Sequence, residues 1–270
     1  VYHRAMNILY VGDVMGEKGI ATVERVLPGL RSEYAIDVVI AQAENVTDGK
    51  GITPEDFTRL KKAGVDACTG GNWTLHRPEI ISVLNDPNQP IVRPANYPAD
   101  TPGLGYKYVD EGDKKVLIVS LLGQIVGRDA DKPVENPLRC IDEILEREKS
   151  VKRAATVVNL HGDFSSEKVV MGHYLDGRVT VVVGDHWHVP TADARVLPGG
   201  TAHMTDVGMC GVLNASLGVS YESIIPRWRD SVQTRNILAE NAPYQFNALL
   251  VRTNDAGLAD SVAFIQKILD

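Results

Sequence analysis

The chain has 270 residues, of which 44% are hydrophobic and 23% are charged, and its formal net charge at pH 7 is −7. This composition is typical of a globular protein with enough apolar residues for a sizeable core. An acidic chain without a Lys/Arg block argues against stable nucleic-acid binding, and apolar runs far shorter than the ~20 residues that span a bilayer argue against a membrane protein.

Residues 1–5 precede the first periodic segment, and we interpret them as a leader or an expression remnant. They lack the basic and apolar layout of a signal peptide, so we expect a cytoplasmic protein.

Strand-like and helix-like segments then alternate along the first part of the chain. Residues 7–12 form an apolar run typical of a buried strand, and residues 20–30 repeat their apolar positions at helical spacing. A second strand is predicted at residues 38–43. Thr53 is a candidate N-cap, with Pro54 at the first position of a helix that ends near residue 63. A short third strand follows at residues 67–69.

The rest of the chain mixes hairpins with helices. Pro78 begins a helix, and residues 106–110 and 116–122 flank the hairpin signal EGDKK. Further helices are predicted at residues 138–149 and 165–175, and further strands at 91–93, 155–160, 179–184 and 246–253. The segment from Ser261 fits a strand or a helix equally well. Strands that alternate with helices predict an α/β fold with helices on both faces of a sheet, in one domain spanning residues 1–270.

The three cysteines are widely spaced and form no CxxC pair. This spacing argues against a disulfide framework and against a thiolate zinc site. We expect Cys68, Cys140 and Cys210 to be buried free thiols.

Polar residues of the metal-binding type follow the predicted strands. In open α/β sheets, sites form at the carboxyl ends of strands. The strand ends carry Gly12-Asp13, Glu44-Asn45, Gly70-Gly71-Asn72, His161 and Asp185-His186-Trp187-His188.

This set of side chains favours a metal centre. Imidazole and carboxylate groups suit iron, manganese and zinc. On an extended segment, His186 and His188 would point to one side and Trp187 to the other. Taken singly, Asp13 and Asn72 are also typical turn residues, and His161 is compatible with a core histidine. Five strand ends with such residues are more than the polarity of loops explains.

The sequence resembles the YmdB-like family of calcineurin-type metallophosphoesterases from about residue 7 to residue 211, and more weakly from there to the C-terminus. The segments that carry the resemblance are GDVMG (12–16), AENVTDGKGIT (43–53), GGN (70–72), RPANYP (93–98), SEK (166–168), YLDGRV (174–179), HVPTAD (188–193) and LPGGTAHMTDVGMCG (197–211). Each segment alone is weak, but their order and spacing make the resemblance specific.

The resemblance implies a four-layer α/β/β/α sandwich with mixed sheets and a phosphodiesterase active on 2′,3′-cyclic nucleotides. It implies two divalent transition-metal ions per chain, iron or manganese, and a small phosphorylated substrate. The implied metal ligands are Asp13, Glu44, Asn72, His161, His186 and His188, with Asn45 as a further contact. Glu44 would bridge the two ions, and Asn45 and Asn72 would also contact the substrate.

Two groups of residues depart from the family pattern. Trp73 stands where the family has a His that protonates the leaving group or holds the phosphate, and indole is only a hydrogen-bond donor. His76, three residues on, is the candidate substitute. Around the ligands, Asn159 and Asp163 replace an Asp and a Glu, and Asp185 and Trp187 replace two Thr residues.

We therefore predict a dinuclear phosphodiesterase that uses a metal-activated hydroxide and works slowly. The alternative is a metal-binding regulatory protein whose catalysis is weak or lost because of Trp73. A dinucleotide-binding oxidoreductase is disfavoured, since GDVMGEKG departs from GxGxxG. The sequence leaves open whether the chain forms a homo-oligomer.

Overall fold

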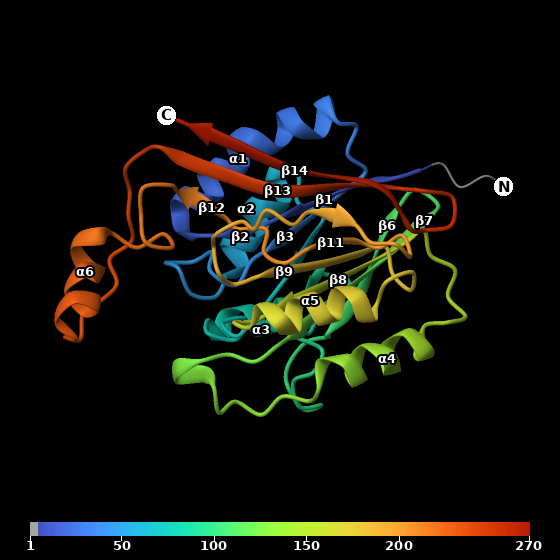
Figure 1. Ribbon diagram of the computed structural model, residues 1–270, viewed down its shortest axis with the longest axis horizontal. Coiled ribbons are helices and arrows are strands. Elements are labelled where there is room, and N and C mark those ends of the chain that lie inside the picture. The colour runs from blue at the N-terminus through green and yellow to red at the C-terminus, as the bar shows by residue number, and fades with distance from the viewer. Residues whose placement is uncertain (1–4) are drawn as a thin grey trace.

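Two β-sheets face each other, and helices cover their outer faces (Figure 1). The structure is a computed structural model that describes residues 5–270. The predicted leader therefore lies outside the described residues, except for Ala5.

The first sheet has eight strands within residues 5–270, in the order β2-β12-β13-β1-β3-β4-β5, with β14 paired to β13. Their bounds are β1 (Asn7–Val11), β2 (Asp13–Val14), β3 (Val38–Gln42), β4 (Ala67–Thr69), β5 (Ile91–Val92), β12 (Met209–Val212), β13 (Tyr244–Thr253) and β14 (Ala259–Leu269). Strands β1, β3, β4 and β5 are parallel neighbours, whereas β13 runs antiparallel to β1. The sheet is therefore mixed, as predicted.

The second sheet has six strands in the described part of the chain, in the order β10-β11-β9-β8-β7-β6. Their bounds are β6 (Tyr106–Glu111), β7 (Lys114–Leu122), β8 (Ala155–His161), β9 (Val181–Asp185), β10 (Arg195–Val196) and β11 (Ala202–Met204). Strands β6 and β7 form the predicted antiparallel hairpin, and β7, β8 and β9 are parallel.

Alternating side chains of the strands build a core on each side of the sheets. Ile8 and Tyr10 of β1 point into the space between the sheets, where they join a cluster that includes Val157 and Val181. Leu9, between them, joins the cluster under the helices instead. Strands buried on both faces explain the continuous apolar runs in the sequence.

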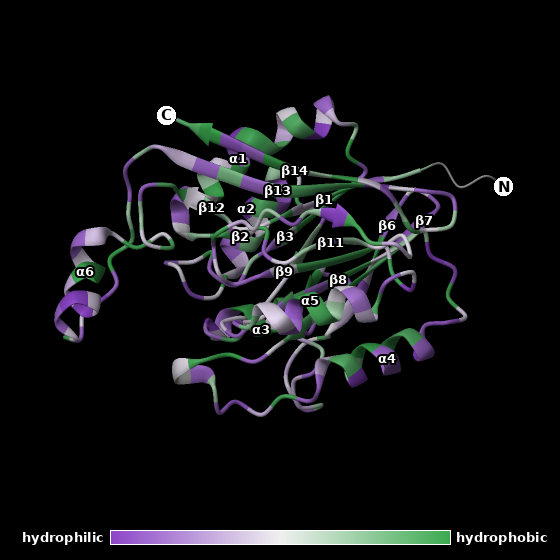
Figure 2. Ribbon diagram, in the orientation of Figure 1, coloured by the Kyte–Doolittle hydropathy of each residue, from purple (hydrophilic) through white to green (hydrophobic). Residues whose placement is uncertain are grey.

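Helices form the two outer layers. Their bounds are α1 (Gly16–Glu33), α2 (Pro54–Ala63), α3 (Ile81–Leu84), α4 (Pro137–Arg147), α5 (Ser165–Tyr174) and α6 (Tyr221–Asp230). Residues of α1 and α2 share one apolar cluster with the first sheet, and residues of α4 and α5 share another with the second. Figure 2 shows α4 with alternating hydrophobic and hydrophilic positions, as expected for a helix that buries one face. The α/β/β/α class is confirmed.

Local predictions at the helix ends and cysteines are also confirmed. The Thr53 hydroxyl accepts a hydrogen bond from the Asp56 N–H at 3.3 Å, and Pro54 is the first residue of α2. The three cysteines are buried and free. The open question about the last segment is settled in favour of a strand, because β14 pairs with β13 along its length.

Residues 186–243 hold elements that the sequence did not predict, among them β10, β11, β12 and α6. In Figure 1, α6 lies apart from the two sheets. No helix in residues 5–270 has the length and apolar character needed to cross a bilayer.

Candidate metal centre

All seven predicted ligand residues lie together, where strands of both sheets end. Six of them are buried, and His186 is partly exposed. They are Asp13, Glu44, Asn45, Asn72, His161, His186 and His188, and we call them the ligand cluster.

One group of donors surrounds Glu44. The His161 Nε2 atom lies 2.9 Å from Glu44 Oε1 and 3.0 Å from Asn72 Oδ1. The His186 Nδ1 atom lies 4.0 Å from the same Glu44 oxygen. Ligand atoms of Glu44, His161 and His186 all lie within 4.8 Å of one another. This group presents two imidazoles, a carboxylate and an amide oxygen to one point.

A second group adjoins the first. The His188 Nε2 atom lies 3.7 Å from Asp13 Oδ1. The Asn45 amide nitrogen lies 3.3 Å from Asp13 Oδ1, 3.2 Å from His188 Nε2 and 3.3 Å from Glu44 Oε1. Glu44 therefore stands between the two groups, which is the position that a bridging carboxylate requires.

Two glycines allow the cluster to close. A Cβ atom on Gly12 would overlap the Gly208 carbonyl oxygen, and one on Gly71 would overlap the Glu44 carboxylate and the His161 ring. Any larger residue at either position would separate the strand ends that carry the ligands.

The segment after β9 corrects one prediction. We expected His186 to His188 to be extended, but His186 has φ 100° and His188 has φ 62°. Strand pairing ends at Asp185, and the backbone N–H of His186 instead donates to Asp13 Oδ2 at 3.2 Å. Both imidazoles still face the cluster, through a left-handed bend of a kind found at functional sites.

Asp185 lies on the Nδ1 side of His161, whereas Glu44 and Asn72 lie on the Nε2 side. Its Oδ1 atom is 2.6 Å from His161 Nδ1. Its Oδ2 atom accepts hydrogen bonds from the Asn159 amide at 2.6 Å and the Tyr10 hydroxyl at 2.8 Å. Burial opposes the charged form of Asp185, but the interaction with His161 outweighs it and lowers the pKa of the carboxyl. Burial opposes the charged form of His161, but the carboxylates of Glu44 and Asp185 outweigh it and raise the pKa of the imidazole well above its usual range. The Asp185 carboxylate on Nδ1 fixes the ring so that Nε2 faces Glu44 and Asn72.

A buried ion pair holds the bend in place. The Lys168 ammonium donates to Asp206 Oδ2 at 2.9 Å and to the Asp185 carbonyl at 2.6 Å. It also lies 4.1 Å from the ring centre of Trp187, whose backbone N–H donates to Asp206. The Trp187 indole N–H donates to the Asp163 carbonyl, so this large side chain is packed beside the cluster.

The donors present fit divalent metal ions. Asp13, Glu44 and Asp185 bury three carboxyl groups almost completely, and bound cations would stabilise their charged forms. Burial, with the charge of Asp185 adding to it, raises the pKa of Asp13 well above its usual range. Burial, with the charge of His161 adding to it, lowers the pKa of His186 to about 4. The His186 imidazole is therefore neutral at pH 7 and keeps a lone pair for a metal ion.

Trp73 joins the cluster only through its backbone, whose N–H donates to Glu44 Oε2 at 2.8 Å. Its indole ring lies 4.5 Å from the Lys50 ammonium and 5.8 Å from that of Lys132. The His76 ring is exposed and packs edge-on against the indole, with 5.1 Å between ring centres. Within residues 5–270, no hydrogen bond or ion pair joins His76 to the ligand cluster.

Several residues around the cluster escaped prediction as parts of the site. Asp129 accepts a hydrogen bond from the Asn72 amide nitrogen at 2.8 Å, which turns Asn72 Oδ1 toward His161. Asp163 Oδ1 lies 3.3 Å from His186 Nε2. The sequence signal for Asp185 was its place at the end of a predicted strand, just before His186, whereas Asp129 lies in a segment without any motif.

Comparisons with known proteins identify relatives that match most of the chain. The YmdB-like protein family model matches residues 9–265. A 2′,3′-cyclic-nucleotide 2′-phosphodiesterase of Bacillus subtilis is 39% identical over 237 residues, which is 87% of each chain. A crystal structure of a hypothetical protein from Thermus thermophilus is 34% identical, with a TM-score of 0.89, and the match covers 98% of this chain and 100% of that one. A novel phosphatase from Mycoplasma pneumoniae is 28% identical, with a TM-score of 0.91, over 99% of this chain and 95% of that one. The predicted enzyme class, a phosphoesterase-type hydrolase, is confirmed.

Proposed function

The chain belongs to the YmdB-like protein family, and we propose that it is a phosphodiesterase that uses two divalent transition-metal ions, iron or manganese, to hydrolyse 2′,3′-cyclic nucleotides. The observation that carries the proposal is the pair of donor groups that share Glu44. The B. subtilis relative, named for this activity, supports the substrate class.

In this proposal Glu44, Asn72, His161 and His186 hold one ion, and Asp13 and His188 hold the other, with Glu44 between them. Two such ions, when bound, supply an activated water and neutralise charge on the phosphate. The protein's own part is to keep the donors oriented. The hydrogen bonds of Asp185 to His161 and of Asp129 to Asn72 fix which atom of each side chain faces the site.

In the same proposal, Asn45 contacts the substrate. Its amide nitrogen lies at the centre of the cluster, within 3.3 Å of acceptors on both sides. An amide N–H at this point can donate to a phosphate oxygen of a bound diester.

In this proposal, protonation of the leaving group is the slow step of the reaction. The Trp73 indole has no proton to transfer at neutral pH, so this role falls to His76 or to solvent. General acid catalysis contributes about 10²–10⁴ in rate. We therefore propose that turnover is slow for substrates with poor leaving groups.

The test combines elemental analysis with a substrate screen. Protein purified with added Mn²⁺ or Fe²⁺ should hold about two ions per chain, since the donors exceed what one four-coordinate ion uses. It should hydrolyse 2′,3′-cyclic AMP, and chelation should abolish the activity. Metal content near zero would refute the metal centre. Two bound ions without turnover of any diester would favour the alternative, a metal-binding regulatory protein.

A further inference from the structure

A cavity of about 480 Å³ adjoins the ligand cluster. Asn72 and Trp73 line it on the side of the cluster, and Tyr97, Pro98 and Pro133 form other walls. Its volume is typical of a small-molecule site, and its lining is more apolar than polar. A group bound here would therefore lie directly beside whatever the ligand cluster holds.

Trp73 is held firmly as a wall of this cavity. Its backbone N–H is fixed by Glu44, and its ring is half-buried between neighbours. The Lys132 ammonium, also a lining group, lies 5.8 Å from the ring centre. Lys132 is itself anchored 3.0 Å from an Asp129 carboxylate oxygen and donates to the Asn72 carbonyl at 3.3 Å. The indole is a half-buried aromatic surface with the Lys132 ammonium over its ring, and this combination suits an aromatic heterocycle that carries an anionic group.

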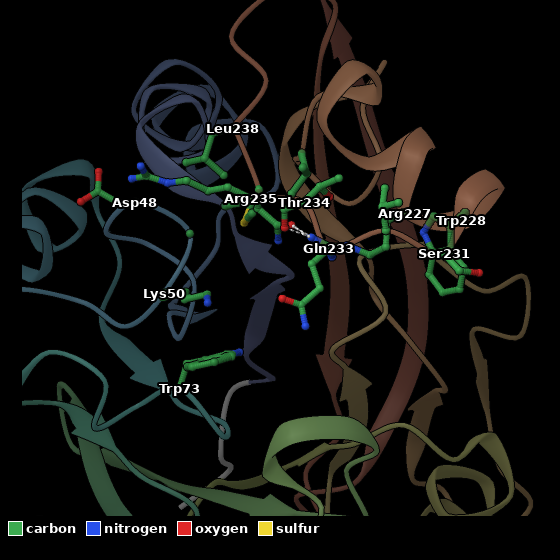
Figure 3. Close-up of a pocket in the computed structure, with 15 residues that line it drawn as sticks. Asp48, Lys50, Trp73, Arg227, Trp228, Ser231, Gln233, Thr234, Arg235 and Leu238 are labelled. Atoms are coloured by element: carbon green, nitrogen blue, oxygen red, sulfur yellow. Dashed lines mark hydrogen bonds between the residues drawn. The ribbon is translucent and has the colours of Figure 1, made fainter.

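A larger cavity, of about 950 Å³, lies on another side of Trp73 and differs in chemistry. Figure 3 shows Trp73 and Lys50 on one side of it and Gln233 and Arg227 on the other, with an open space between them. Arg235 adds a further cation to its lining. This wide space has a mixed lining that includes the cations of Lys50, Arg227 and Arg235 beside apolar side chains, whereas the lining of the smaller cavity is more apolar than polar. The smaller cavity therefore suits a planar ring better.

We propose that the smaller cavity is the base subsite, in which the purine or pyrimidine of the substrate stacks on Trp73 while its phosphate lies at the ligand cluster. The proposal rests on the proposed function, because it assigns a place to the base of a nucleotide substrate. It gives Trp73 a role in choosing nucleotides over other phosphate esters, which stacking supplies without reading the identity of the base.

The test measures binding, so that it is independent of turnover. Isothermal titration calorimetry of the metal-loaded protein compares adenosine 3′-monophosphate with ribose 5-phosphate, which lacks a base. The parent should bind the nucleotide about tenfold more tightly, a difference of about 1.4 kcal/mol. Trp73→Ala should reduce the ratio to near one, and Trp73→Phe should retain most of it.

Two cavity-filling variants locate the base without removing Trp73. Thr101 lines the smaller cavity and Gln233 lines the larger one. Thr101→Trp should abolish the preference for the nucleotide, and Gln233→Trp should leave it unchanged.

Two results would overturn the proposal. One is a parent that binds both compounds equally. The other is a preference that Gln233→Trp removes and Thr101→Trp preserves, which would place the base in the larger cavity. Failure of the proposed function is a separate result, because a protein that prefers the nucleotide but cleaves no diester would retain the base subsite and lose the proposed reaction.

Discussion

Replacing Asp185 with Asn should weaken metal binding without unfolding the protein. In the parent, both carboxylate oxygens accept: Oδ1 faces His161 Nδ1, and Oδ2 faces the Asn159 amide and the Tyr10 hydroxyl. An Asn side chain must turn its NH₂ toward one of these sides. If the new NH₂ group faces Asn159 and Tyr10, it meets two groups that are themselves hydrogen-bond donors. If it faces His161, the imidazole must accept through Nδ1 and carry its proton on Nε2, the atom that faces Glu44.

Either orientation of the Asn side chain should lower the affinity for metal, because a favourable contact of the carboxylate is lost. Loss of a carboxylate that orients a metal-binding imidazole typically weakens metal affinity by about 10- to 100-fold. At about 1.4 kcal/mol for each factor of ten, this is roughly 1.4–2.7 kcal/mol of binding free energy. The loss should fall mainly on one of the two ions, since His161 belongs to the donor group around Glu44 and Asn72.

The assay is a competition titration of the chelated protein with Mn²⁺ against a metal-binding dye. Tyr10→Phe is the matched control, because it removes one donor to the same carboxylate and keeps the charge and the bond to His161. Its affinity should stay within a few-fold of the parent. Asp185→Asn with parental affinity would refute the argument. If Asp185→Asn lowered the free energy of unfolding of the chelated protein by as much as it lowers the free energy of metal binding, Asp185 would stabilise the fold itself.

Two further predictions concern the second donor group and the buried ion pair. His188→Ala should retain about one ion per chain by elemental analysis, because the donors around Glu44 remain intact; loss of both ions would contradict two separable groups. Lys168→Met should reduce the free energy of unfolding of chelated protein by about 3–5 kcal/mol, because it leaves Asp206 buried without its cation. A urea denaturation curve within roughly 1 kcal/mol of the parent's would refute this.

The ligand cluster was predictable because its signal is local. Each residue of the cluster lies at the end of a predicted strand or in the short segment that follows it. The rule that sites form at the carboxyl ends of strands needs no knowledge of which strands pair. The role of Asp185 was not predictable in this way. It depends on the register of β8 with β9, which sets His161 opposite Asp185. The sequence shows Asp185 as a strand-end residue that departs from the family pattern, and only the strand pairing shows that it contacts His161.

Elements stabilised by distant partners were harder to predict. Strand β12 has four residues and pairs with both β2 and β13, so its neighbours hold it in the strand conformation. The apolar pattern of β14 fits a strand or a helix, and its pairing with β13 explains why it forms a strand. The bend at His186 was mispredicted for a related reason, because the side chains of Asp13 and Asp206 take the backbone N–H groups that a neighbouring strand would otherwise bind.

The substitution Trp73→His should separate two effects of this residue, namely the lack of an acid for the leaving group and the stacking surface for the base. Restored imidazole supplies an acid with an ordinary pKa near 6.5, so kcat on 2′,3′-cyclic AMP should rise, within the ~10²–10⁴ range of acid catalysis. Because the smaller ring stacks less well, KM should rise as well. An aryl diester with a good leaving group should gain little in kcat, since its departure needs no proton.

The comparison with Trp73→Phe identifies the cause. Phenylalanine retains a stacking face and carries no proton, so this variant should keep both the KM and the slow kcat of the parent. His76→Ala should slow the parent sharply if His76 is the acid, and should slow Trp73→His much less. If Trp73→His leaves kcat unchanged while both metal ions are bound, the missing proton is not what limits the reaction. The metal-binding regulatory protein would then be the better account of this chain, because the departure that we hold responsible for slow catalysis would have been reversed without effect.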